Sequence, residues 1–135
     1  MSRAADTSVV VPALLISHSA HERCAAALHG TSAVVAHVLA EAYSVLTRMP
    51  QPARVEPRLA ADALAANVPR KTVGLAPSAY AALPSRLAEA GLSGGSIYDA
   101  LVALGAAEHG LRLVTRDARA ARTYRSLGVA FDLMA

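Results

Sequence analysis

Four acidic residues stand at comparable positions along the sequence, next to segments expected to form strands. Asp117 directly follows the stretch 111–116, which contains an expected strand, and Asp6 lies beside the first apolar run of the chain. Asp99 opens an expected helix after a glycine-rich joint, and Glu41 lies on a helix that follows another apolar stretch. Reactive side chains of an open parallel sheet gather at the carboxyl ends of its strands. We therefore expect these four acids to lie close together.

Carboxylates that gather in this way have a definite chemistry. They repel one another and raise one another's pKa unless a cation lies between them. Ligand sets made only of oxygen suit Mg²⁺ or Mn²⁺, with water molecules completing the coordination. Such an ion activates a water molecule and stabilises the charge on a phosphate under in-line attack. The chemistry that the four acids imply is hydrolysis of a phosphodiester.

Each acid also has a purely structural interpretation. Aspartate is favoured at helix N-caps, so Asp6 and Asp117 would serve as caps without any chemistry. Ser96 and Asp99 have the spacing of a capping box at the start of one helix. Glu41 lies at the edge of the apolar face of its helix and would be an ordinary solvated glutamate. Spacing alone leaves both interpretations open.

Helix-like and strand-like apolar periods alternate along the chain. Pro84 is expected to kink or split a helix, while Gly110 and Gly128 follow helices at points where a left-handed C-cap favours glycine. The expected helices cover Val34–Met49, Val55–Val68, Pro77–Ala90, Ile97–His109 and Asp117–Leu127. The expected strands are Ala33–Ala36, Thr72–Leu75, Leu111–Thr115 and Val129–Leu133. This alternation predicts an α/β fold, a parallel sheet with helices on both faces.

The composition predicts one folded domain, residues 1–135. Apolar residues make up 54% and charged residues 17%, which excludes a disordered chain because enough apolar surface offsets the entropy of ordering. With 32 alanines and 4% aromatic residues, methyl groups must fill much of the core. The one cysteine, Cys24, has no partner for an internal disulfide, which favours a cytoplasmic location. The apolar run Val9–Ile16 is too short to span a bilayer, so no membrane segment is expected.

The charge pattern is mildly basic, with a formal net charge of +3 from 13 basic and 10 acidic residues. If the four candidate ligands are set aside, 13 bases face six acids, a balance of +7 that favours a polyanionic partner. Arg116, Arg119, Arg122 and Arg125 recur every three residues beside Asp117. They form either a solvated helix face or an edge that grips phosphate groups.

Four short motifs give the chain a family resemblance. Asp6-Thr7-Ser8, Ala40-Glu41, Tyr98-Asp99-Ala100 and Thr115-Arg116-Asp117 follow one another in the order and spacing of a PIN-domain ribonuclease. The length resembles that of a VapC-type toxin of a toxin–antitoxin pair. No single motif is specific, but together they cover essentially the whole chain.

The resemblance implies a three-layer α/β/α fold with a central, mostly parallel sheet. It implies that the first strand ends at Asp6 and that Asp6, Glu41, Asp99 and Asp117 surround one Mg²⁺ or Mn²⁺ ion. Ser8 and Thr115 would support this site, and Arg116, Arg119 and Arg122 are candidates for RNA binding. The resemblance also implies a helix at Val9–Leu15, although its β-branched residues favour a strand. The stretch Ser2–Ala5 departs from the family pattern because it lacks the Val, Ile or Leu expected of a buried first strand.

The implied function is metal-dependent, endonucleolytic cleavage of RNA, in a tRNA or a ribosomal RNA, which stops translation. The implied partners are a second copy of the chain and an antitoxin protein, with operator DNA bound only through the antitoxin complex. The alternative is a non-catalytic α/β binding or signalling module that acts through a partner protein. A receiver-like module needs one essential aspartate and a lysine near a strand's carboxyl end, whereas Lys71 precedes its strand. A zinc site at His18 and His21 is disfavoured because no cysteine or carboxylate completes it.

Overall fold

A computed structural model describes residues 1–135 as five short strands among eight helices. The strands are β1 (Arg3–Ala5), β2 (Val34–Val35), β3 (Thr72–Val73), β4 (Arg112–Thr115) and β5 (Phe131–Leu133). The pairs β1–β4, β4–β5 and β2–β3 are all parallel. The Ser32 N–H donates to the carbonyl oxygen of Arg3 at 3.0 Å and brings β2 beside β1. The strands form a three-stranded sheet, β1-β4-β5, and a two-stranded sheet, β2-β3, which lie side by side at β1 and β2 and give the spatial order β3-β2-β1-β4-β5.

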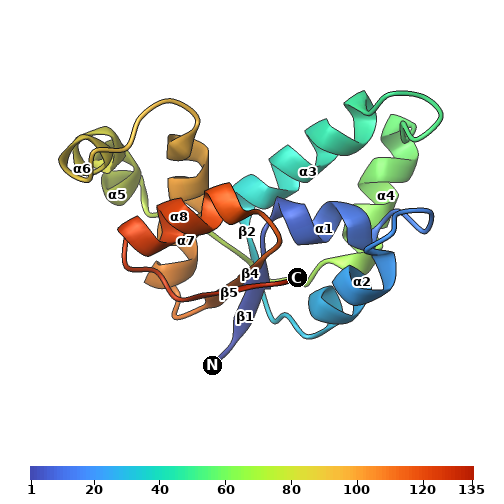
Figure 1. Cartoon of the computed structure of the whole chain (residues 1–135), viewed down its shortest axis with the longest axis horizontal. Coiled ribbons are helices and arrows are strands. Elements are labelled where there is room, and N and C mark those ends of the chain that lie inside the picture. The colour runs from blue at the N-terminus through green and yellow to red at the C-terminus, as the bar shows by residue number, and fades with distance from the viewer.

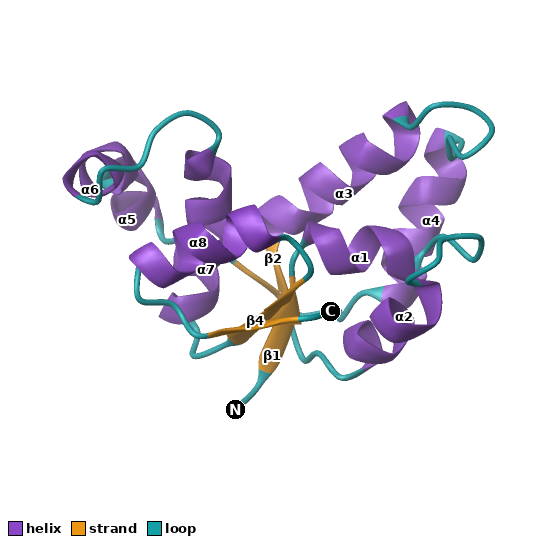
Figure 2. Cartoon of the chain, in the orientation of Figure 1, coloured by secondary structure: helices purple, strands orange, loops and turns teal.

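The helices cover both faces of these strands (Figure 1). One group is α1 (Thr7–Ala13), α2 (His21–His29), α3 (Ala36–Arg48) and α4 (Pro57–Asn67). The other group is α5 (Pro77–Ala81), α6 (Leu83–Glu89), α7 (Ser96–Glu108) and α8 (Ala118–Ser126). Figure 2 shows the strands between the two groups. The predicted α/β/α layers are therefore confirmed, and no helix is long and apolar enough to cross a membrane.

The first strand is built from alanine rather than from large aliphatic residues. Ala4 and Ala5 are 0% and 2% exposed, and they pair with Leu113 and Val114 of β4. Because β1 lies in the middle of the strand order with helices on both faces, small side chains suit its crowded position. The strand ends at Ala5, one residue before the predicted end at Asp6, which instead caps α1.

Helix α7 has a long unbroken buried stretch, with every residue from Ala100 to Ala106 in the interior. Gly105 allows this packing, because a Cβ atom there would lie 2.9 Å from Cγ1 of Val35 in β2. The tight approach of α7 to β2 fixes the height of the helix above the strands. It thereby fixes the place of Asp99, which lies in the first turn of α7.

Most predicted elements are present with shifted ends. The predicted helix Pro77–Ala90 is split at Ala82 into α5 and α6, with Pro84 in the first turn of α6. The helix expected at Val9–Leu15 begins earlier, as α1, because Asp6 caps it. The capping-box interpretation is wrong, since Ser96 is already helical and the N-cap is Gly95, without a side-chain cap. Gly110 and Gly128 have φ angles of 67° and 70°, which confirms their place after helix ends.

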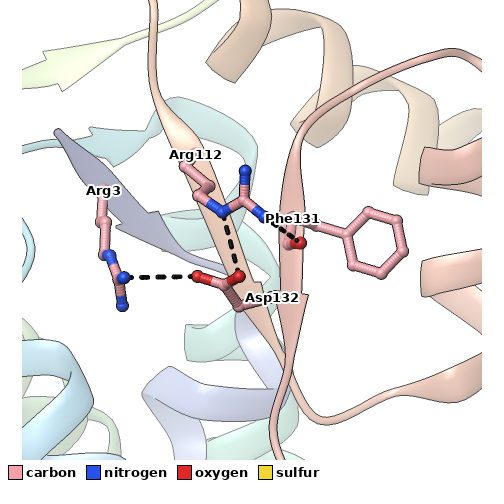
Figure 3. A network of polar contacts seen from close by, with 4 residues as sticks. All are labelled: Arg3, Arg112, Phe131 and Asp132. Carbon is pink, nitrogen blue, oxygen red and sulfur yellow. Dashed lines mark hydrogen bonds and ion pairs between the residues drawn. The ribbon is translucent and has the colours of Figure 1, made fainter. Parts of the chain in front are cut away.

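An ion-pair network joins the three strands of the larger sheet (Figure 3). Arg112 donates from Nε to Asp132 Oδ1 at 3.0 Å and from Nη2 to the Phe131 carbonyl oxygen at 3.1 Å. Arg3 Nη2 lies 3.5 Å from Asp132 Oδ2. These side chains are partly exposed, so the network adds little stability. Arg3 and Arg112 are therefore occupied by contacts within the sheet.

Candidate active site

The strand order creates a position where reactive groups converge. After β1 the chain turns towards β2, and after β4 it turns the other way, towards β5. Ligands of open α/β sheets bind at such a reversal, beyond the carboxyl ends of the two strands. Asp6 directly follows β1 and Asp117 follows β4 by two residues. The topology therefore brings two carboxylates from opposite ends of the sequence to adjacent strand ends.

All four predicted acids line one cavity of about 370 Å³ at this reversal. Glu41 reaches it from α3 and Asp99 from the first turn of α7. Ser8 and Arg116 also line this cavity, together with apolar side chains of α1, α3 and α7. Chain positions more than a hundred residues apart thus contribute to a single acidic pocket.

Asp6 is the most buried acid of the pocket, at 5% exposure. Its Oδ1 accepts hydrogen bonds from the Ser8 N–H at 3.0 Å and from Ser8 Oγ at 2.6 Å. Its Oδ2 accepts a hydrogen bond from the hydroxyl of Tyr124 at 2.8 Å. Burial raises the pKa of Asp6, and the hydrogen bonds from Ser8, Thr115 and Tyr124 partly lower it again. The residue therefore caps α1, as its structural interpretation predicts, and also borders the cavity.

Asp117 likewise caps a helix, α8, and lines the cavity. Its Oδ1 accepts hydrogen bonds from the N–H groups of Arg119 and Ala120, at 2.9 and 3.3 Å. Thr115 Oγ1 accepts a hydrogen bond from the Asp117 N–H at 3.1 Å and lies 3.3 Å from Ser8 Oγ. Ser8 and Thr115 therefore connect the β1–α1 loop to the β4–α8 loop, and they fix the two aspartates relative to each other.

Glu41 and Asp99 complete the pocket from the helices above the strands. The Thr7 hydroxyl donates a hydrogen bond to Glu41 Oε1, and His37 Nε2 lies 3.9 Å from Glu41 Oε2. Burial, and after it the negative charges of Asp117, Glu41 and Asp6, together raise the pKa of Asp99 to about 6. The negative charges of the acids thus repel one another, and a bound cation would relieve this repulsion.

The donor set fits a hard divalent cation. It consists of carboxylate and hydroxyl oxygens, without sulfur, and Mg²⁺ retains several waters and binds through one or two carboxylates. No three His, Cys, Asp or Glu side chains are close enough in this structure to form a complete ligand cluster. The four acids surround the pocket without converging on one point, so water molecules would have to bridge part of the coordination.

The three candidate RNA-binding arginines have different environments. Arg116 borders the acidic pocket, donates from Nη1 to the Ser8 carbonyl oxygen at 3.4 Å, and has a buried Nε without any partner. Arg119 and Arg122 are exposed on α8, and the charge of Arg119 lowers the pKa of Asp99. Arg125 instead lies over the ring of Phe131, 5.4 Å from its centroid. Of this series, Arg116 lies in the pocket itself.

Tyr124 and Thr7 belong to the site but had no predicted role in it. The helical period assigns Tyr124 to the apolar face of α8, and its ring is indeed packed edge-on against Phe131. A periodic pattern does not reveal what the hydroxyl at the end of that ring meets. Thr7 lies between two predicted site residues, and this adjacency was the one available signal.

Comparison with known proteins identifies the family. The family model described as PIN domain matches residues 4–126. The chain belongs to the PIN-domain family. It is 46% identical over 127 residues to ribonuclease VapC27 of Mycobacterium tuberculosis, covering 93% of this chain and 92% of the relative. This similarity groups the chain with the VapC proteins of the PIN-domain family.

Solved structures share the PIN-domain architecture at lower identity. VapBC2 of Rickettsia felis, solved with a DNA fragment of its promoter, superimposes with a TM-score of 0.68 and 17% identity over 100% of both chains. VapC20 of Mycobacterium tuberculosis, described as a toxin that cleaves the sarcin-ricin loop, has a TM-score of 0.68 and 19% identity over 90% and 94% of the two chains. At such identities the likeness is evidence of a shared fold alone.

Proposed function

We propose that this PIN-domain protein is a metal-dependent endoribonuclease, the toxin of a toxin–antitoxin pair. The observation that carries the proposal is the pocket in which Asp6, Glu41, Asp99 and Asp117 meet beside Arg116. The similarity to ribonuclease VapC27 supports RNA as the substrate. The four acids would hold Mg²⁺ or Mn²⁺, which supplies charge neutralisation and an activated water for hydrolysis of the phosphodiester.

The protein's own side chains would orient the substrate and the ligands. Arg116 would meet a phosphate oxygen, because its fork of N–H donors matches phosphate and its Nε has no protein partner. Ser8 and Thr115 hold the two loops that carry Asp6 and Asp117. Tyr124 holds Oδ2 of Asp6 in a fixed orientation. Cleavage would leave a 5′-phosphate and a 3′-hydroxyl.

The proposal extends to partners and location. The expected substrate is a tRNA or a ribosomal RNA, and VapC20 is described as cleaving one ribosomal RNA loop. An antitoxin protein and a second copy of the chain are the expected protein partners. DNA would be bound only through the antitoxin complex. The Rickettsia felis VapBC2 structure is an example of a complex bound to promoter DNA. RNA cleavage and the single cysteine favour action in the cytoplasm.

The decisive experiment is cleavage of total cellular RNA by the purified protein with Mg²⁺, with Mn²⁺ and with EDTA. Asp99→Asn removes one pocket charge at nearly constant shape, while Asp62→Asn removes an exposed acid that pairs with Arg58 on α4. We expect discrete products with either metal, none with EDTA or Asp99→Asn, and normal products from Asp62→Asn. Cleavage that survives EDTA or Asp99→Asn would refute the metal-dependent mechanism, whereas intact RNA with a folded, antitoxin-free protein would favour the binding-module alternative.

A further inference from the structure

A second hollow, of about 330 Å³, lies next to the acidic pocket. Its lining is mainly apolar and includes Leu75 and Leu101, with the rings of His37 and Tyr80 at its border. A small-ligand pocket of roughly 300–1,000 Å³ with apolar walls and aromatic rings is suited to a flat, partly apolar ligand. Gly74 adds no side chain to the lining and leaves room for a ring.

The aromatic residues of this chain are few, and their distribution is uneven. Phe131 and Tyr124 pack on each other inside the protein. Tyr43, Tyr80 and Tyr98 are 40%, 55% and 53% exposed. Tyr98 also forms a parallel stack with His37, with centroids 5.5 Å apart and planes 8° apart. Exposed rings in a chain with so few of them offer stacking surface rather than core packing.

His37 connects the hollow to the acidic pocket. It lines the hollow, while its Nε2 lies 3.9 Å from Oε2 of Glu41, one turn further along α3. Tyr98, which stacks on His37, directly precedes Asp99 of the acidic pocket on α7. One turn of helix spans about 5.4 Å, which is of the order of the distance between a phosphate and the base of its own nucleotide. A phosphate at the acids would therefore leave a neighbouring base at the hollow.

We propose that this hollow, the base hollow, binds one unpaired nucleobase of the RNA substrate, stacked on His37 and Tyr80, with Tyr98 supporting the His37 ring. The proposal rests on the proposed RNA cleavage. Proteins recognise single-stranded RNA by stacking splayed bases on Tyr and His rings. Such stacking tolerates any base, because each base has a π face. The base hollow therefore selects an unpaired nucleotide beside the cut rather than a particular sequence.

The test measures RNA binding apart from cleavage. A fluorescent single-stranded oligouridine is titrated in EDTA against each variant, because base stacking tolerates any base. A single-stranded RNA across the cut site is titrated in the same way once that site is mapped on total cellular RNA. We expect Tyr80→Ala to raise Kd by about 5- to 100-fold, the range found when a stacking ring is lost. Tyr98→Ala, which removes the support of the His37 ring, is expected to act in the same direction.

Matched variants separate stacking from general damage. Tyr43→Ala removes an exposed tyrosine of α3 that lines neither pocket, and it should leave Kd unchanged. Tyr80→Phe keeps the ring and should restore binding to within about twofold, whereas Tyr80→Leu should not. In cleavage, KM should rise while kcat stays near that of the unaltered protein, because the acids are untouched. 2-Aminopurine beside the cut should be quenched on binding, and Tyr80→Ala should abolish the quenching.

The outcomes distinguish failure of the base hollow from failure of the ribonuclease proposal. If the unaltered protein cuts RNA and Tyr80→Ala and Tyr98→Ala bind RNA like Tyr43→Ala, the base hollow is refuted. If these variants instead lower the sedimentation coefficient without changing Kd, the surface is a contact between copies, and the base hollow is again refuted. If RNA binds with the expected losses but is never cut, the base hollow stands and the ribonuclease proposal fails.

Discussion

The hydrogen bond from Tyr124 to Asp6 allows a quantitative test of how the acidic pocket is held together. Tyr124 is 1% exposed and Asp6 is 5% exposed, and the hydroxyl lies 2.8 Å from Oδ2. Tyr124→Phe keeps the ring and its edge-on contact with Phe131 but removes the only donor to Oδ2. A hydrogen bond to a charged group contributes about 1.5–3 kcal/mol, so the free energy of unfolding should fall by about that amount.

Urea unfolding at neutral pH without divalent ions measures this loss, with Tyr80→Phe as the control. Tyr80 is 55% exposed, so loss of its hydroxyl should change the stability by less than about 0.5 kcal/mol. The hydrogen bond from Tyr124 lowers the pKa of Asp6, so its removal should raise this pKa further. Because a protonated Asp6 no longer needs a donor at Oδ2, the loss should shrink as the pH is lowered.

A double-mutant cycle separates the pair from its surroundings. In the Asp6→Ala background the Tyr124 hydroxyl is left buried without its acceptor, so Tyr124→Phe should be neutral or stabilising there. Titration of Mn²⁺ into the Tyr124→Phe protein should also reveal weaker binding, since Oδ2 is no longer oriented. Equal stabilities of Tyr124→Phe and Tyr80→Phe, or the same effect in both backgrounds, would refute the assignment of Tyr124 as a positioning residue for Asp6.

Two further predictions follow from the same packing and charges. The pKa of Asp99, raised from 3.8 to about 6, means that the folded state holds this proton more tightly than the unfolded chain, so stability should fall as pH rises between these values. Urea unfolding of Asp99→Asn should lack this pH-dependent loss of stability. Mg²⁺ affinity, measured by calorimetry, should weaken as the pH falls below about 6, because Mg²⁺ must then displace the proton of Asp99. An affinity that does not change with pH would contradict the raised pKa of Asp99. Gly105→Ala places a methyl group 2.9 Å from Val35 Cγ1 and should destabilise the protein by about 1–3 kcal/mol. Gly95→Ala, where the added methyl group meets open space, is the control. Equal melting temperatures of the two variants would contradict the tight α7–β2 contact.

Much of the fold followed from local patterns in the sequence. Proline and glycine act through the backbone of their own residue, so the split near Pro84 and the turns at Gly110 and Gly128 needed no tertiary information. Helical periodicity located α3, α4, α7 and α8 to within a few residues. Strand lengths were overestimated, because the apolar run at 33–36 contains both the two residues of β2 and the first residue of α3, Ala36.

The candidate site was predictable as far as chain order and residue type define it. Asp6 directly follows β1 and Asp117 follows β4 by two residues, and in a parallel sheet that position brings both residues to one edge. Their interpretation as helix caps is confirmed, and the same two residues also line the pocket. The capping-box interpretation failed at Ser96, where local spacing gave no information on where α7 begins.

The sequence alone determined the alternation of elements, the four acids and the family that their order resembles, because these depend on residue type and spacing. Only the tertiary structure decided which groups touch those acids. The Tyr124 hydroxyl meets Asp6 across 118 positions, and Thr115 meets Ser8 across 107. The stack of His37 on Tyr98 likewise depends on how α3 and α7 pack. Such contacts are set by strand order and helix packing, which bring distant residues together through many interactions that no local pattern records.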